Sequence, residues 1–134
     1  MLGLGKTKHR NMEEAVYAIL KSRARTSIYV YLIRKKEART EQIIKGTKLH
    51  PSTVRETLSQ MYNQKLIYRK KIKNAGIGKN PYMYYPIPAI ELLKKSVNEI
   101  EDRLNEIASL TFSKEKNKEY RPVKIKIYER VDEV

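Results

Sequence analysis

The sequence predicts a mainly helical α+β fold, with several helices and a β-hairpin, then a long helix and a short C-terminal strand. Three patterns support this prediction. Apolar residues recur at helical spacing through most of residues 11–63, and alternation over residues 66–73 and 81–87 indicates two strands. A heptad repeat of apolar residues then covers residues 90–107. The length of 134 residues suits one compact domain with an appendage.

The composition excludes several classes of protein. The chain has no cysteine, which excludes disulfides, zinc fingers and thiol nucleophiles, and His9 and His50 are its only histidines. No apolar run is long enough to span a membrane, and residues 1–10 lack the apolar stretch of a signal peptide. No paired carboxylates, nucleophile with a base, or phosphate-binding loop can be assembled. We therefore expect a cytoplasmic protein that is not an enzyme, with no membrane, metal or cofactor.

The positive charge is concentrated in the first two-thirds of the chain. Residues 1–85 hold 19 basic and 5 acidic side chains, whereas residues 86–134 hold 10 of each. A basic part beside a neutral part favours a domain that binds a polyanion, above all nucleic acid, joined to a part with another role. The alternative is a lysine-rich surface that only maintains solubility, and abundant Lys, Glu and Ile also fits a thermophile.

The first two helices are predicted from caps and apolar spacing. Residues 1–10 read as a flexible basic arm, and Asn11 is expected to cap a helix that ends near Ser22. Residues 25–37 are predicted to be helical because apolar residues keep helical spacing, although this run is rich in β-branched and aromatic residues. Thr40 begins a short third helix, and residues 46–49 form its end and a turn.

The sharpest local signal is His50 followed by Pro51, since proline is favoured at the first position of a helix. The helix that follows carries a single apolar stripe of Val54, Leu58 and Met61. The side chains on its opposite face are small and polar. A helix that enters a major groove and contacts base edges needs such a face. The alternative is an ordinary amphipathic surface helix, which has a similar pattern. The residues expected nearest to the bases are Ser52, Thr53, Arg55 and Ser59.

The predicted hairpin follows this helix. Leu66, Tyr68 and Ile72 fall on one side of its first strand, and turn residues at 74–80 lead into the second strand. Residues 65–79 contain six basic side chains and no acidic one, which suits contact with a phosphate backbone. The residues expected to contact phosphates are Arg69, Lys71, Lys73 and Lys79. A nucleotide-binding loop at Gly76-Ile77-Gly78 is discounted, because a third glycine and a following helix are missing.

Residues 12–88 resemble the winged helix-turn-helix domain of prokaryotic transcriptional regulators, most of all archaeal ArsR-like and TrmB-like regulators. The resemblance depends on Ile43, on the run Leu49-His50-Pro51-Ser52-Thr53-Val54, and on Leu58, Met61, Leu66 and Ile67. It implies a DNA-binding domain with a dimerisation helix. Three positions depart from the pattern. Lys48 stands where glycine is usual, Ile44 stands where a small residue is usual, and His50 stands where serine or threonine usually caps the helix. Because a left-handed non-glycine residue costs about 1 kcal/mol, Lys48 suggests a locally altered turn.

The long helix over residues 89–112 carries apolar residues spaced alternately three and four apart, which favours an intermolecular coiled coil. The alternative is a helix that packs back on its own domain. Lys95, Asp102 and Asn105 lie on the polar face opposite the stripe, and Lys94 facing Glu101 of a partner weakly favours an antiparallel dimer. The residues expected to form the dimer interface are Ile90, Leu93, Val97, Ile100, Leu104 and Ile107.

Residues 113–134 read as a charged linker followed by a strand over residues 123–127, because Val123, Ile125 and Ile127 alternate with polar residues. A lone strand is unstable, so it is expected to add to the hairpin of its own chain or to a partner subunit; a flexible tail is the alternative.

The sequence thus predicts four parts: a flexible arm (1–10), a winged helix-turn-helix DNA-binding domain (11–88), a dimerisation helix (89–112), and the linker with its strand or tail (113–134). The leading hypothesis is a homodimeric, sequence-specific transcriptional regulator that binds double-stranded DNA at paired half-sites, with no small-molecule effector evident. The alternative is a winged-helix scaffold or basal-transcription-like subunit that binds proteins, and DNA only non-specifically. A defined operator sequence favours the first, and co-purification of polymerase components favours the second.

Overall fold

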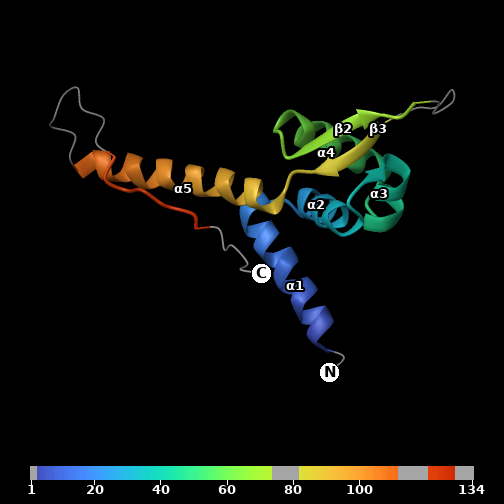
Figure 1. The fold of residues 1–134 in the computed structure, drawn as a ribbon, viewed down its shortest axis with the longest axis horizontal. Coiled ribbons are helices and arrows are strands. Elements are labelled where there is room, and N and C mark those ends of the chain that lie inside the picture. Colours follow the sequence, from blue (N-terminus) through green and yellow to red (C-terminus); the bar gives the residue numbers. More distant parts are fainter. Residues whose placement is uncertain (1–2, 74–81, 112–120, 129–134) are drawn as a thin grey trace, which may run out of the picture. The chain divides into compact units, whose positions relative to one another are not determined.

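The computed structural model describes residues 3–73, 82–111 and 121–128, which form five helices and one small antiparallel sheet (Figure 1). The mainly helical α+β fold class predicted from the sequence is confirmed. The chain divides into two compact units, Met1–Ile87 and Pro88–Val134.

The first unit contains four helices and three strands. In chain order they are α1 (Gly3–Leu20), α2 (Arg23–Lys35), β1 (Ala38–Arg39), α3 (Thr40–Thr47), α4 (Pro51–Asn63), β2 (Ile67–Lys71) and β3 (Tyr82–Pro86). The strand order is β1-β3-β2 and both pairings are antiparallel. The hairpin of β2 and β3 was predicted from the sequence. Strand β1 was not, because two residues are too few to show an alternating pattern.

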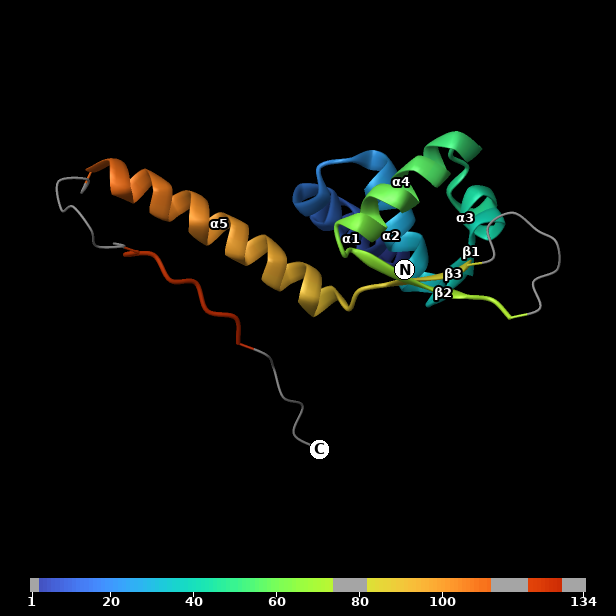
Figure 2. The same ribbon diagram turned by 90° about the horizontal axis from the view of Figure 1, so that it is seen from above.

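Helix α2 lies at the centre of the first unit, where it packs against α1, α3, α4 and β3 (Figure 2). Its run of β-branched and aromatic residues is helical, as predicted, because four neighbouring elements bury its side chains and outweigh the strand propensity. The core residues of the unit include Ile28, Tyr29, Val30 and Leu32 from α2, Ile43 from α3, Val54, Leu58 and Met61 from α4, and Leu66, Ile67 and Tyr84 from the hairpin.

Tyr29 fastens the end of the hairpin to the core. Its side chain is buried, and its hydroxyl donates a hydrogen bond of 2.8 Å to the carbonyl oxygen of Ile87. Burial raises the pKa of Tyr29 to about 12, because the phenolate is less well solvated there than in water. The neutral hydroxyl is therefore the form that stabilises the fold.

We expect Tyr29→Phe to lower the free energy of unfolding by about 1 kcal/mol, the usual net worth of one hydrogen bond. The raised pKa gives a further expectation. The contribution of Tyr29 is fully present below the unfolded pKa of 10.0 and is lost as the pH rises toward 12. Urea unfolding of both proteins between pH 8 and about 11 measures this. If the two proteins lose stability in parallel above pH 10, Tyr29 is not the group responsible.

The N-terminal part of the first helix differs from the sequence prediction. Helix α1 begins at Gly3, so residues 3–10 are helical rather than an irregular arm, and Asn11 lies inside the helix instead of capping it. Adding a residue to an existing helix forms one hydrogen bond at a lower entropic cost than starting a helix does. Helix α1 can therefore extend into the basic segment. The side chain of Ser22 caps α2, accepting a hydrogen bond of 3.2 Å from the backbone N–H of Arg25.

Four exposed lysines adopt positive φ angles at the ends of helices: Lys21 (55°), Lys36 (73°), Lys48 (60°) and Lys65 (61°). The expected alteration of the turn at Lys48 is wrong, because this residue adopts the left-handed conformation that glycine usually provides. Its N–H still donates to the carbonyl oxygen of Ile44, at 3.0 Å. A lysine charge near the C-terminus of a helix interacts favourably with the helix dipole, which offsets part of the backbone cost.

The third helix ends within residues 46–49, as predicted, because α3 extends to Thr47 and Lys48 follows as its C-cap. Gly46 lies in its last turn. A glycine is required there for a steric reason. A Cβ atom at this position would overlap the aromatic ring of Tyr31 on α2, so the absence of a side chain lets the two helices approach closely.

The second unit consists of α5 (Ala89–Thr111) and an extended segment, residues 121–128, that runs beside it (Figures 1 and 2). The side chain of Asn105 donates to the carbonyl oxygen of Val123 and accepts from its N–H, both at 3.0 Å. The N–H of Ile125 donates to Glu101, also at 3.0 Å. Arg121 lies 2.6 Å from a carboxylate oxygen of Asp102.

These contacts bear on two sequence predictions. Residues 121–128 are extended, and side chains of α5 bond the backbone groups of Val123 and the N–H of Ile125. In the described part of the chain these residues are not a strand of the sheet, and pairing with a partner subunit stays a prediction. Asn105 was placed on the exposed polar face of the helix, yet it is only 4% exposed. Asn105 is buried because its side chain bonds the backbone of Val123 in the extended segment.

Candidate nucleic-acid interface

Helix α4 has one buried face and one exposed polar face, as the sequence predicted. Val54, Leu58 and Met61 are buried against the first unit, and Thr57 joins them. His50 caps the helix, as expected, because its Nδ1 accepts a hydrogen bond of 3.2 Å from the backbone N–H of Ser52. The exposed face of α4 is therefore held in position at its N-terminus and along its length.

The four residues expected to contact bases all lie on this helix, but they differ in solvent exposure and in whether they already have a hydrogen-bond partner. Ser52, Arg55 and Ser59 are exposed at intervals of three and four residues, which places them on one face, whereas Thr53 is half-buried. The hydroxyl of Ser52 lies 2.7 Å from Nδ1 of His50, so it already has a local partner. Arg55 and Ser59 are consequently the stronger candidates for contact with bases.

Arg69, expected to contact phosphates, is held between two tyrosine rings. Its guanidinium carbon lies 3.9 Å from the ring centre of Tyr62, on α4, and 4.3 Å from that of Tyr82, on β3. Cation–π contacts of this kind contribute about 0.5–2 kcal/mol. These contacts connect the end of α4 to both strands of the hairpin, so the guanidinium group of Arg69 is preorganised between α4 and the β2–β3 hairpin.

The alternating pattern of the first hairpin strand does not separate a buried side from an exposed one. Leu66 and Ile67, on opposite sides of the strand, are both buried, whereas Tyr68 is 46% exposed. Tyr68 pairs directly across the sheet with Tyr85, and the two rings stack with centres 5.1 Å apart. Lys70 lies over Tyr85 at 5.3 Å. A hydrogen bond to Glu37 raises the pKa of Tyr85 above its ordinary value. The outer face is thus aromatic and basic.

Three lysines of the hairpin were also predicted to contact phosphates, and the structure describes two of them. Lys71 and Lys73 are exposed at the end of β2, in the same part of the hairpin. Lys79 lies outside the described residues. Within the parts of the chain that the structure describes, no group of His, Asp and Glu side chains could hold a metal ion, and no helix is long and apolar enough to cross a membrane.

The comparison with protein families decides where the chain belongs. A family described as the TFIIE alpha subunit matches residues 11–117, most of the chain. The chain belongs to the TFIIE alpha subunit family. This TFIIE alpha family member is therefore a transcription-related protein with a winged-helix domain. The finer resemblance to ArsR-like and TrmB-like regulators is not confirmed and stays a prediction.

The structure of this TFIIE alpha family member is similar to a solved structure described as a possible transcriptional regulator from Methanosarcina mazei Go1. The TM-score is 0.59 at 19% sequence identity, over 77% of this chain and 88% of the other. At this identity the similarity supports the winged-helix fold. No curated protein matches the sequence significantly.

Sequence reasoning missed two residues of the interface, Tyr62 and Tyr82. They are 20 positions apart in this TFIIE alpha family member and approach each other only because β3 folds back on β2. Their shared contact with Arg69 depends on tertiary structure, and the one available signal was the number of tyrosines around the hairpin.

Proposed function

We propose that this protein binds double-stranded DNA as a homodimer and regulates transcription at specific sequences. Helix α4 enters the major groove, and the β2–β3 hairpin contacts the adjacent phosphate backbone. The observation that carries the proposal is the pairing of the small, exposed polar face of α4 with the clamped Arg69 beside it. Base contacts from Arg55 and Ser59 supply specificity, and lysines of the hairpin supply affinity.

The apolar stripe of α5 supports the homodimer. Leu93, Ile100, Leu104 and Ile107 are all exposed in the single chain, and Ile107 is 63% exposed. A heptad stripe of this kind is normally covered by another helix, and a second copy supplies the matching stripe. Glu101 already contacts Ile125 and Arg121, which weakens the argument that it selects an antiparallel partner.

We expect Arg55→Ala and Ser59→Ala each to relax the sequence preference, because base contacts contribute discrimination of about 1–3 kcal/mol. The fold should be unaffected, since both side chains are exposed. Selection of bound sequences from a random duplex library measures the preference directly. Arg103→Ala and Ser109→Ala on α5 remove the same residue types elsewhere and serve as controls. An unchanged preference in both α4 variants would move recognition to another segment.

Membership of the TFIIE alpha family favours a second candidate function. In this candidate the protein is a basal-transcription-like subunit that binds other proteins and contacts DNA without sequence preference. The same selection experiment separates the two, since this candidate predicts no enriched sequence and co-purification with RNA polymerase components. In both candidates the protein acts by binding, without catalysis.

A further inference from the structure

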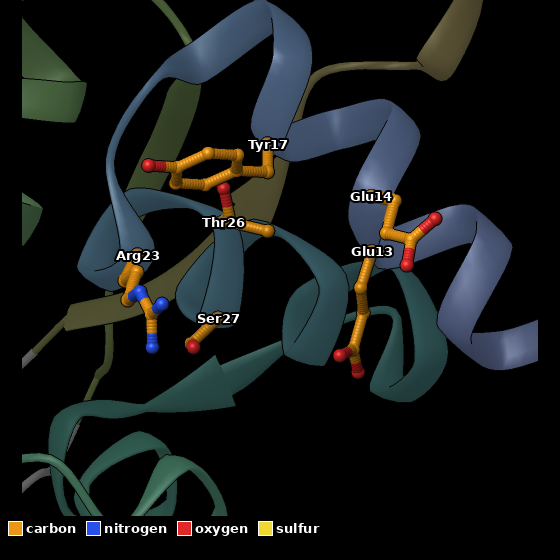
Figure 3. A pocket seen from close by; sticks show the side chains of 6 residues that line it. All are labelled: Glu13, Glu14, Tyr17, Arg23, Thr26 and Ser27. Carbon is orange, nitrogen blue, oxygen red and sulfur yellow. The ribbon is translucent and has the colours of Figure 1, made fainter.

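A pocket of about 390 Å³ lies between α1 and α2, within the first unit (Figure 3). Its volume falls in the range of about 300–1,000 Å³ that is typical of small-molecule sites. The proposed function does not involve this pocket. It is lined by Glu13, Glu14, Tyr17, Arg23, Thr26 and Ser27.

The charged groups of the pocket are separated by sign. Figure 3 shows Arg23 and Ser27 toward one side and the carboxylates of Glu13 and Glu14 toward the other. Arg23 is also the first residue of α2, where backbone N–H groups lack helical partners and the helix dipole favours an anion. The pocket thus offers donors for an anionic group at one end and acceptors for a cationic group at the other.

Thr26 provides an independent observation that points to a ligand. Its side chain is 6% exposed, and its hydroxyl oxygen is the one buried side-chain polar atom without a hydrogen-bond partner among the described residues. Figure 3 shows this hydroxyl directed toward Tyr17, whose ring forms one wall of the pocket. Buried hydroxyls are normally satisfied. Because Tyr17 is 46% exposed, its ring can move to admit a ligand that bonds Thr26.

The acidic side of the pocket is unusual for this chain. Residues 1–85 contain 5 acidic residues in all, and two of them, Glu13 and Glu14, line this one pocket. Glu13 is shared with Arg34, whose Nη2 lies 3.3 Å from one carboxylate oxygen. Among the described side chains none pairs with Glu14. Among the described residues of this strongly basic unit, the carboxylate of Glu14 therefore stands at the edge of the cavity without a basic side chain beside it.

We infer that this pocket binds a small zwitterion of the amino-acid class. The carboxylate of the ligand binds Arg23, the hydroxyl of Thr26 and the N-terminus of α2. Its ammonium group binds Glu14, assisted by Glu13, and its apolar part lies against the ring of Tyr17. This inference does not depend on the proposed function, because ligand binding is measured without DNA.

The test is calorimetric titration of the full-length protein with each standard L-amino acid up to about 10 mM, with amide chemical shifts to locate the site. We expect at least one amino acid to bind and to shift the amide signals of Thr26 and Ser27. Its analogues that lack the carboxylate or the amino group should bind at least about tenfold more weakly, because each loses a charge-assisted contact.

Single variants assign the two ends of the pocket. Arg23→Gln and Glu14→Gln should each reduce the affinity at least about tenfold, whereas Lys35→Gln and Glu56→Gln, which remove one charge of the same sign elsewhere, should leave it unchanged. Thr26→Val removes the unsatisfied hydroxyl. It should weaken ligand binding while leaving the unliganded protein at least as stable, which a purely structural role of Thr26 does not predict.

Three results would overturn the inference. They are the absence of binding and of shifts at Thr26 for every amino acid, equal binding of the singly charged analogues, and undiminished affinity in both Arg23→Gln and Glu14→Gln. None of these outcomes bears on the function proposed for α4 and the hairpin.

Discussion

Raising the salt concentration from 50 to 200 mM should lower the affinity of the protein for duplex DNA by about a thousandfold. The first 85 residues carry a net charge of +14, and α4 with its hairpin presents Arg55, Arg69, Lys71 and Lys73. If about six phosphates are neutralised, released counterions give a slope near −5 in a plot of log K against log salt. Fluorescence anisotropy with a labelled duplex at several salt concentrations measures this slope.

The hairpin lysines should account for part of this dependence. The double variant Lys71→Ala with Lys73→Ala is expected to weaken binding to all sequences alike and to reduce the slope by about 2. Lys124→Ala with Lys126→Ala removes the same charge from the second unit and should change the slope much less. A Lys71/Lys73 variant that keeps its affinity but prefers a different sequence would show that the hairpin reads bases instead.

The second large effect concerns assembly. Val97→Glu with Ile100→Lys places charges in the middle of the apolar stripe of α5. In the proposed homodimer a second helix would bury these charges unpaired, so the variant should be monomeric. Because the second contact in a dimer is effectively intramolecular, loss of the dimer is expected to lower DNA affinity by about 10² or more. Analytical ultracentrifugation measures the mass, and circular dichroism measures whether α5 remains helical.

The matched control is Lys95→Glu with Glu99→Lys. These residues are exposed and lie off the stripe, and the exchange leaves the net charge unchanged, as the first double variant does. The control should remain dimeric. If the Val97/Ile100 variant also stays dimeric, the interface is elsewhere. An unfolded variant would instead mean that α5 packs on its own chain.

Helix α4 could be predicted closely from the sequence because its signals are local. Pro51 begins the helix, His50 caps it, and apolar residues at intervals of three and four set its buried face. The central helix α2 was harder, since its composition favours a strand, and only the continued spacing through Leu32 indicated the helix.

The features that escaped prediction all depend on residues distant in sequence. Arg69 meets Tyr62 and Tyr82 only after the hairpin closes. The alternation over residues 66–73 did not indicate which side of the strand is buried, because Leu66 and Ile67, on opposite sides, are both buried. Asn105 bonds Val123, 18 positions later, and nothing in a helical pattern distinguishes such a side chain from an ordinary polar one. The periodicity of apolar residues identifies helices and strands, but which side chains of different elements contact one another depends on how those elements pack.

The lysines at positive φ have a consequence for engineering the protein. Glycine at Lys21, Lys36, Lys48 and Lys65 would relieve a backbone cost of about 1–2 kcal/mol at each position, less the extra freedom that glycine gives the unfolded chain. The same four changes would lower the formal net charge from +14 to +10 and so reduce long-range attraction to a polyanion. We expect the glycine variants to resist heat better only where the relieved backbone cost exceeds the lost helix-dipole interaction, and to associate more slowly with DNA.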